Sequence, residues 1–374
     1  MGQPGISYGF IRMTENSHEE DNGSREVFVR VAYSCAGEGF GHAARMVALY
    51  EDLQKDCQVF LFVPEPVQDF VKYRLPEAKL FSIPCFEFVK QNNRIRYLPT
   101  VLEGIRRGLH FIPAVRRLAK KLMELHIDVV LSDFEPYLPW AARLAGIPIV
   151  QMNHPGIVHR FITWDPRSWL ASLVARLMEG PWDKRVLVSF YYGDVGPVLR
   201  PSLHRYTVKD EGFFAVNLKE DARKRILPLL ERHLPGRYQL FPEKGKDFDY
   251  ALTHCTAVIS TAGHQTISEA LVLGKPILAV AQDGQYEQML NARMLEASGR
   301  GMGCTTAGLA ATLPRFFQFV RQYRVPRIIL PRFCFKNSQA HLLQKLKGLF
   351  VSLTGKELLP LFKENQGVRK VHSA

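Results

Sequence analysis

The chain has 374 residues, of which 47% are hydrophobic and 23% charged, a composition that excludes a disordered, collagen-like or coiled-coil protein. This length exceeds what one hydrophobic core comfortably holds and suits two domains of roughly 150 to 200 residues each. Lys and Arg number 49 against 36 Asp and Glu, so the net charge of +13 favours an anionic partner.

The sequence shows neither an export signal nor a metal-binding pattern. No stretch approaches the roughly 20 apolar residues of a membrane-spanning helix, and residues 1–26 are polar where a signal peptide would be apolar. The six cysteines are scattered without a CxxC pair, which supports neither a zinc site nor a redox motif. We therefore expect a cytoplasmic protein, at most peripheral on the inner face of the cytoplasmic membrane, with no metal and no bound cofactor.

In chain order, β-branched and aromatic runs alternate with segments whose apolar residues recur at helical spacing. In the first half we expect strands at 27–33, 57–63, 127–131 and 147–152, and helices at 43–53, 111–125 and 138–145. The prolines and glycine of residues 196–201 indicate an interdomain connection. After it we expect strands at 213–218, 238–241, 257–260 and 276–280, and helices at 220–233 and 265–273.

This alternation predicts an α/β fold with two doubly wound, Rossmann-like domains that face a cleft. Residues 1–26 are expected to form a flexible tail, residues 27–200 the first domain and residues 201–335 the second. Ligands of open parallel sheets lie beyond the carboxyl ends of the strands. The loops that follow the strands are therefore where chemistry is expected.

A glycine loop follows the first strand and contains Gly37, Gly39 and Gly41, with His42 directly after it. Glycines there let backbone N–H groups approach an anion or a sugar closely. The spacing fails the dinucleotide fingerprint, because His42 stands where a glycine is needed, and the loop lacks the Lys-Ser/Thr of a P-loop. His42 is a candidate general base, and the alternative is a tight turn whose histidine caps a helix.

A second motif begins with Gly263 and His264 after a strand and opens a helix. Thr266 in its first turn is placed to bond a phosphate, and Glu269 on the same face is placed to accept both hydroxyls of a ribose. This spacing suits a nucleoside diphosphate. Further along, a carboxylate stands beside amides, which suits a hexose, at Gln285, Glu287 and Gln288.

Two more strand ends face the expected cleft. Asp133 and Glu135 follow one strand, and one of them is expected to orient His42 or to touch an acceptor. The alternative for both is a solvated loop before a helix that starts at Pro136. His154 follows another strand, where an acceptor contact and a structural role are equally open.

Three segments in order carry a resemblance to a known family: GFGHAAR over 39–45, SDFEP over 132–136 and GQYEQMLNA over 284–292. The chain resembles the GT-B glycosyltransferases, and within them a prokaryotic group that shares GxGFGHxxR and SDFEP. More distantly it is similar to the lipid I N-acetylglucosaminyltransferase, monogalactosyldiacylglycerol synthase and the plant UDP-glucosyltransferases. The resemblance implies an acceptor-binding first domain, a nucleotide-sugar-binding second domain and a helical segment over 336–374 that packs back on the first.

The resemblance also implies roles for single residues. The backbone of Gly263 and His264 and the side chain of Thr266 would hold the diphosphate, Glu269 the ribose, and Glu287 with Gln288 the donor sugar. His42 would lie opposite, at the acceptor hydroxyl. The sequence departs from the plant enzymes at Thr261, which stands where they have a phosphate-contacting histidine.

The function that follows is transfer of a hexose or related sugar from a nucleoside diphosphate sugar, expected to be a UDP-sugar, to a hydroxyl of a lipid or glycan, with inversion and without a metal. A nucleotide-sugar epimerase of the same architecture is the enzymatic alternative. A basic protein that binds a membrane or nucleic acid without catalysis is the alternative from another class, but no RNA-recognition or helix-turn-helix pattern accompanies the charge.

A basic segment at 90–121 holds nine Lys and Arg residues against one Glu, with apolar residues between them. Such an amphipathic surface is typical of contact with anionic lipid. Trp164, Trp169 and Trp182 flank an expected helix at 168–178 and suit an interfacial anchor. The alternative is a solvated helix face with buried aromatic residues.

Overall fold

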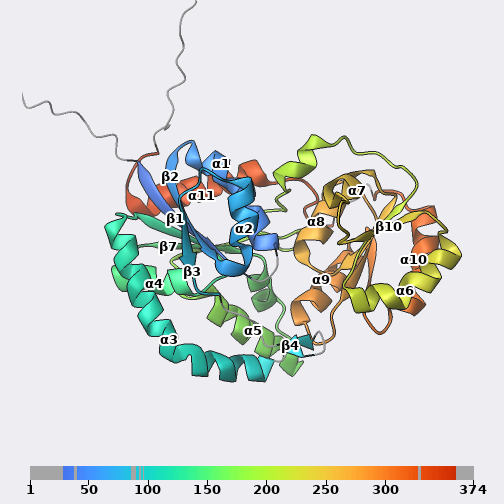
Figure 1. Ribbon diagram of the computed structural model, residues 1–374, viewed down its shortest axis with the longest axis horizontal. Helices are drawn as coiled ribbons and strands as arrows, with labels where there is room; N and C mark the ends of the chain where they lie inside the picture. The colour runs from blue at the N-terminus through green and yellow to red at the C-terminus, as the bar shows by residue number, and fades with distance from the viewer. Residues whose placement is uncertain are drawn as a thin grey trace, which may run out of the picture.

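The computed structural model describes residues 28–37, 40–85, 90–91, 94–95, 97–326 and 330–358. Its long strands form two parallel sheets that lie in two halves of the molecule, side by side (Figure 1). The predicted α/β class with two doubly wound sheets is confirmed. The tail expected at 1–26 lies outside the described residues.

The first sheet has six parallel strands in the order β3-β2-β1-β6-β7-β8, so the chain runs outward from β1 in both directions. Alternate residues of β1 enter different cores, Val31 on one face of the sheet and Ala32 on the other. The strands are β1 (Val29–Cys35), β2 (Cys57–Pro64), β3 (Leu80–Ile83), β6 (Val129–Asp133), β7 (Ile149–Asn153) and β8 (Lys184–Leu187).

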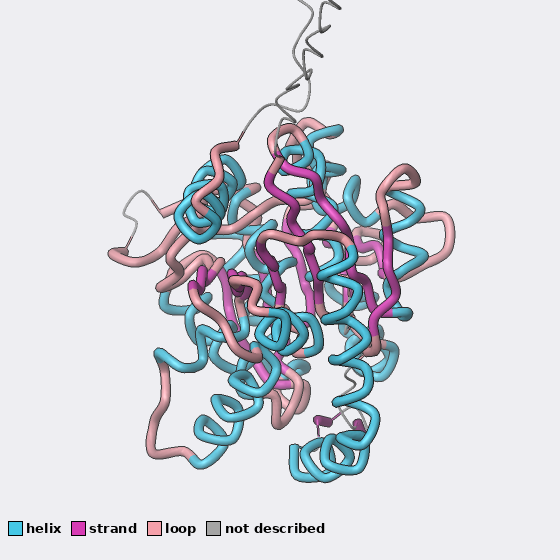
Figure 2. The backbone as a smooth tube through the Cα atoms, turned by 90° about the vertical axis from the view of Figure 1, so that its left-hand side faces the viewer, coloured by secondary structure: helices cyan, strands magenta, loops and turns pink. Residues whose placement is uncertain are grey.

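Helices cover both faces of this sheet, as the layered tube in Figure 2 shows. One face carries α1 (Gly41–Gln54), α2 (Glu65–Arg74) and α11 (Gln339–Thr354), and the other α3 (Tyr97–Glu124) and α4 (Tyr137–Ala145). Although α11 comes last in the chain, Leu342, Leu346 and Phe350 are fully buried against the first sheet. The chain therefore returns to its first half after completing the second.

Helix α3 is 28 residues long, and the prediction of a helix at 111–125 missed its first half. Pro113 lies inside it, where a proline removes one backbone hydrogen bond and usually marks a helix boundary. From Ala114 onward the buried positions recur at helical spacing, through Leu118 to Leu122, while Arg117 faces solvent. The packing of this face holds the helix together across the proline.

The second sheet has five parallel strands in the order β10-β9-β11-β12-β13. They are β9 (Phe214–Asn217), β10 (Tyr238–Phe241), β11 (Ala257–Thr261), β12 (Ile277–Ala281) and β13 (Gly301–Thr305). One face carries α6 (Glu220–His233) and α10 (Leu309–Gln322). The other carries α7 (Phe248–His254), α8 (His264–Val272) and α9 (Tyr286–Ala297).

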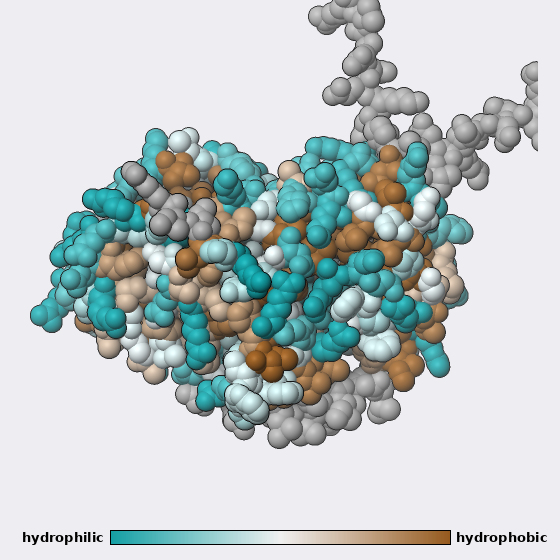
Figure 3. All heavy atoms as spheres, turned by 180° about the vertical axis from the view of Figure 1, so that it is seen from behind, coloured by the Kyte–Doolittle hydropathy of each residue, from teal (hydrophilic) through white to brown (hydrophobic). Residues whose placement is uncertain are grey.

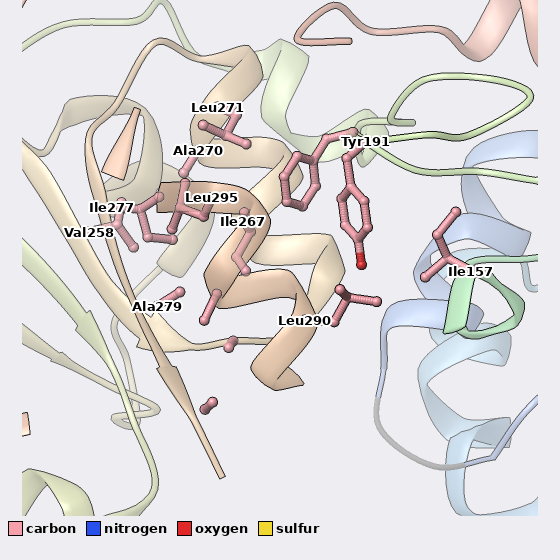
Figure 4. Close-up of a cluster of buried hydrophobic side chains, with 14 of the residues drawn as sticks. Ile157, Tyr191, Val258, Ile267, Ala270, Leu271, Ile277, Ala279, Leu290 and Leu295 are labelled. Atoms are coloured by element: carbon pink, nitrogen blue, oxygen red, sulfur yellow. The ribbon is translucent and has the colours of Figure 1, made fainter. Parts of the chain in front are cut away.

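The face with α8 and α9 continues into the first half of the molecule. One hydrophobic cluster joins Ile267 and Leu290 to Ile157 and to residues of α5 (Pro166–Glu179). In Figure 4, Tyr191 lies between the helices of the second half and Ile157. The two halves thus share a packed core behind the cleft, which holds the carboxyl ends of their sheets facing one another.

The remaining described elements are short. They are the antiparallel pair β4 (Lys90–Gln91) and β5 (Arg94–Ile95), and the 3-10 turns η1 (Pro155–Arg160) and η2 (Pro201–Arg205). Among the described residues, no helix combines the length and apolar character that crossing a membrane would require.

Candidate active site

A cavity of about 420 Å³ lies between the carboxyl ends of the two sheets. The first half supplies the start of α1 and the ends of β6 and β7. The second half supplies the ends of β11 and β12 and the starts of α8 and α9. Nine of the predicted site residues line this cavity: Gly41, His42, His154, Gly263, His264, Thr266, Gln285, Glu287 and Gln288.

His42 is held from below by Asp133. The register of β1 and β6 places Asp133 beside Cys35, one loop away from His42. His42 Nδ1 lies 2.7 Å from Asp133 Oδ1. An ionised carboxylate only accepts hydrogen bonds, so Nδ1 carries the proton and Nε2 is left as the basic nitrogen. The structure brings together the two residues predicted to be catalytic.

Arg45 completes this network. Its Nε donates to Asp133 Oδ2 over 2.7 Å and its Nη2 donates to Oδ1 over 3.0 Å. Burial alone would raise the pKa of Asp133, but the charge of Arg45, and after it that of His42, holds the pKa below its usual range. Asp133 is therefore a fixed anion, and it has no exposed surface from which to touch an acceptor.

Phe134 packs against the side of the hydrogen-bond network formed by His42, Asp133 and Arg45. Its φ of 61° lies in the left-handed region, which is rare for a bulky residue, and its ring stacks on His42 with centroids 5.8 Å apart. Backbone strain of this kind persists where surrounding contacts hold it. The turn at Phe134 points Asp133 toward His42 and directs Glu135, the residue after Phe134, away from it.

Glu135 is not among the residues that line the cavity, and its side chain points to the start of α4. Its carboxylate accepts hydrogen bonds from the backbone N–H groups of Tyr137 and Leu138, at 2.8 and 3.0 Å. It is 3% exposed and does not line the cavity, and burial raises its pKa to about 7. Glu135 satisfies the first turn of α4, as a buried cap does.

The glycines of the loop have different reasons to be glycine. A Cβ on Gly37 would lie 2.6 Å from Cys85 Sγ and 2.8 Å from Pro64 Cβ, so Gly37 makes room for packing rather than for a ligand. A Cβ on Gly41 would lie at an ordinary 3.6 Å from Gln265 Cβ, across the cleft. Gly39 lies outside the described residues.

The opposite wall is built from the start of α8. Gly263 caps this helix, so its first backbone N–H groups open toward the cavity, and Thr266 lies in the first turn. Such a helix start favours an anion. No atom lies within 4 Å of a Cβ built on Gly263, which leaves open space beside the helix start.

The ring of His264 is buried and stacks on His154, with centroids 3.6 Å apart and planes at 15°. His154 comes from the first half, and its Nε2 lies 2.9 Å from Asn291 Oδ1 and 3.8 Å from Glu287 Oε1. Burial lowers the pKa of His154 to about 3 and that of His264 well below its usual value, so both rings are neutral. His154 therefore borders the wall expected to hold the donor, although it comes from the half expected to hold the acceptor.

At the start of α9 the side chains are tied down. Gln288 Oε1 accepts a hydrogen bond from the backbone N–H of Gln282 over 2.9 Å. Asn291 accepts from the Tyr191 hydroxyl over 2.7 Å and donates to Ala262 O over 3.1 Å. Asn291 thus connects the loop before α8 to the first half of the molecule.

Glu269 differs from its expectation. It is fully buried and does not line the cavity, and its carboxylate is held by Arg200 from the connection between the two halves. In this arrangement the carboxylate does not face the cavity where a ribose would bind.

Sequence reasoning gave no role to Arg45, Asn291, Arg200 or Lys219. Lys219 lines the cavity directly after β9, so the rule that ligands lie beyond strand ends could have found it. Arg45 follows His42 by three residues, on the same helix face. Among the described residues, no three His, Cys, Asp or Glu side chains come together as a metal site.

Over residues 29–212 and 232–321 the chain matches the protein family described as glycosyl transferase family 1. An uncharacterized glycosyltransferase of Methanosarcina mazei is 37% identical over an alignment of 235 residues, and the match covers 60% of this chain and 55% of the relative. The chain thus spans about half the length of that curated relative.

Solved structures share the fold at low identity. MurG of Acinetobacter baumannii matches with a TM-score of 0.51 and 16% identity over 86% of this chain and 99% of that one. The calicheamicin glycosyltransferase CalG4 matches at 0.53 and 14% over 88% and 100%. VinC in complex with dTDP matches at 0.51 and 12% over 87% and 100%. These likenesses confirm the GT-B architecture, and because the family match spans well over half of the sequence, the chain belongs to glycosyl transferase family 1.

Proposed function

We propose that this protein transfers a sugar from a nucleoside diphosphate sugar to a hydroxyl group of an acceptor. One observation carries the proposal. A histidine oriented by a buried carboxylate lies across a single cavity from a helix start that carries Gly263 and Thr266. The first wall suits proton removal, and the second suits an anionic leaving group.

In the proposed reaction His42 Nε2 takes the proton of the acceptor hydroxyl. The acceptor oxygen forms a bond to the anomeric carbon while the bond from that carbon to the diphosphate oxygen breaks. The diphosphate leaves with the electron pair, toward the N–H groups at the start of α8 and the hydroxyl of Thr266. Attack from the side opposite the leaving group inverts the anomeric centre. The imidazolium that forms is stabilised by Asp133, which stays ionised.

The donor is proposed to be a UDP-sugar with a hexose. The backbone of Gly263 and His264 and the side chain of Thr266 would hold its diphosphate, and Gln285, Glu287 and Gln288 its sugar. The complex of VinC with dTDP supports a nucleoside diphosphate ligand for this architecture. The helix start offers partial positive charge of the kind that a metal would supply, so we propose that the reaction needs no divalent ion and survives a chelator.

The acceptor is proposed to be a lipid or a glycan, reached by a cytoplasmic enzyme at the inner face of the membrane. Trp169, Leu173 and Leu177 share one face of α5 and are 61%, 53% and 55% exposed, and Trp164 before the helix is 98% exposed. Trp182 packs instead against the core of the first half. The basic helix α3 belongs to the first half of the molecule, as α5 does. On the face of the molecule drawn in Figure 3, patches of hydrophobic residues interrupt the hydrophilic surface.

The donor site is tested by thermal shift and calorimetry against UDP, dTDP and their sugars. We expect one nucleotide to stabilise the wild type, and Thr266→Val to weaken its binding about fivefold through loss of one hydrogen bond. Thr312→Val, a threonine of α10 away from the cavity, is the matched control. Absence of binding to every nucleotide would contradict the proposal. A sugar that is changed while still attached to its nucleotide would indicate an epimerase instead.

A further inference from the structure

The carboxylate of Glu269 already accepts hydrogen bonds from two side chains. Arg200 donates from Nε to Oε1 over 2.8 Å and from Nη2 to Oε2 over 2.7 Å. Gln265 Nε2 adds a third hydrogen bond, to Oε1, over 2.8 Å. A carboxylate offers about four lone-pair positions, and this one has no exposed surface. Glu269 therefore cannot accept two ribose hydroxyls while Arg200 stays where it is.

Arg200 has a second anion within reach. Its Nη1 lies 3.0 Å from Asp249 Oδ1 on α7. Arg200 and Asp249 line another cavity, of about 560 Å³, together with Asp247 and Tyr206. The guanidinium thus lies between two acidic groups, one buried beside the main cavity and one facing the second cavity.

If a ribose displaced Arg200 from Glu269, the number of hydrogen bonds and the pairing of charges would both be preserved. Two ribose hydroxyls would replace the two N–H donors of Arg200 on Glu269. The freed guanidinium would keep a counterion, because Asp249 already contacts it and Asp247 lies in the same cavity wall. Neither charge would be left buried without a partner, which is the costly outcome.

Arg200 also belongs to the connection between the two halves. Gln265, which shares Glu269 with Arg200, donates to Val198 O of that connection over 3.0 Å. Movement of Arg200 would therefore loosen the hold of the connection on α8 at the moment when the donor binds.

We propose that Arg200 is a positioning residue that holds the ribose-binding carboxylate until the donor displaces it, and that it then turns to Asp249 and Asp247. This inference rests on the proposed function, because it assigns Glu269 to the ribose of a nucleoside diphosphate. In this arrangement part of the donor's binding energy is used to displace Arg200, so the wild type binds more weakly than the bare carboxylate would.

The test compares binding of UDP and of 2′,3′-dideoxy-UDP by calorimetry in the wild type, Arg200→Met and Arg200→Lys. Arg205→Met, which removes another arginine lining the second cavity, is the matched control. We expect Arg200→Met to bind UDP about tenfold more tightly, the size of one hydrogen bond to a charged group. The gain should vanish for dideoxy-UDP, because it lacks the hydroxyls that compete with Arg200. Arg200→Lys keeps the positive charge but loses the paired N–H donors of the guanidinium. It should show an intermediate gain in UDP affinity even where Arg200→Met folds poorly.

Unchanged or weaker UDP binding in folded Arg200 variants, with normal binding by the wild type, would overturn the inference and leave the proposed function standing. An equal gain for dideoxy-UDP would overturn it as well, because the competition would then not involve the ribose. UDP binding that appears in Arg200→Met and is absent from the wild type would support the inference. Absence of binding in every variant, to UDP and to dTDP alike, would overturn both proposals.

Discussion

The two walls of the cleft are prepared in different ways. On the first wall the charged groups are paired with one another. Asp133 is fixed by Arg45 and holds His42 in one tautomer. On the second wall the start of α8 lines the cavity, whereas the carboxylate of Glu269 is held by Arg200. We therefore expect the first wall to keep its arrangement when a ligand binds, and the second wall to rearrange if Glu269 is to contact one.

The largest effect is expected when the first wall loses its base. His42→Ala should lower kcat by about 100- to 10,000-fold, the usual contribution of a positioned general base. The dissociation constant for the nucleotide should stay the same, because the donor is proposed to bind the other wall. Initial rates and calorimetry check both parts, with His341→Ala on the exposed side of α11 as the control. Equal losses in binding and in rate would show that the walls are not separate.

The next effect concerns the anion under the base. Asp133→Asn leaves the Arg45 guanidinium buried without its counterion. It should lower the free energy of unfolding, measured by urea denaturation, by about 3 to 5 kcal/mol. The pKa of Asp133 is below its usual range, so its contribution is present above about pH 4 and is lost as the pH falls through the folded-state pKa. The difference between wild type and variant should therefore shrink in acid.

The control for Asp133→Asn is Glu220→Gln, which breaks an exposed pair with Lys224 and should leave stability nearly unchanged. A loss for Asp133→Asn no larger than for this control would contradict the account of a buried, fixed anion.

A pH-dependent effect of intermediate size is expected at Glu135. Burial raises its pKa to about 7, so between the unfolded value near 4.3 and pH 7 the folded protein holds more protons than the unfolded chain. Its contribution therefore falls as the pH rises through this window. Relative to Glu135→Gln, the wild type should lose about 2 kcal/mol of unfolding free energy between pH 5 and pH 8. Parallel pH profiles for the two proteins would contradict this environment.

The smallest effect separates packing from ligand binding within the glycine loop. Gly37→Ala places a Cβ against Cys85 and Pro64 and should lower the free energy of unfolding by about 1 kcal/mol or more. Gly41→Ala meets only an ordinary contact with Gln265 and should be closer to neutral for stability. Thermal unfolding of the two variants compares their stabilities. A larger loss of stability in Gly41→Ala than in Gly37→Ala would refute the packing role of Gly37.

Local patterns predicted much of this fold. The alternating strands and helices around β1, β6, β9 and β11 follow from β-branched runs and helical spacing, and those runs place the loops of the site. Short or weakly patterned elements such as β8 and β13 were missed. The GMGCT of β13 has two glycines and no β-branched residue until Thr305, so its strand conformation depends on pairing with β12.

The site was predictable only where chemistry lies close to a strand end. His42 comes shortly after β1 and Asp133 ends the neighbouring strand β6, so their pairing follows from the sheet. The contact between Arg200 and Glu269 joins residues 69 positions apart, and the stack of His154 on His264 joins the two halves. Such pairings depend on how the halves pack together, and no local pattern in the sequence carries that information.

The most direct test of the account is release of the nucleoside diphosphate with and without an acceptor. Wild-type protein is incubated with a UDP-sugar and a membrane-lipid or oligosaccharide acceptor, and UDP is quantified while NMR reads the anomeric configuration of the product. The account predicts acceptor-dependent UDP release, inversion at the anomeric carbon, and loss of both in His42→Ala. Release that is independent of the acceptor and unaffected by His42→Ala would contradict it.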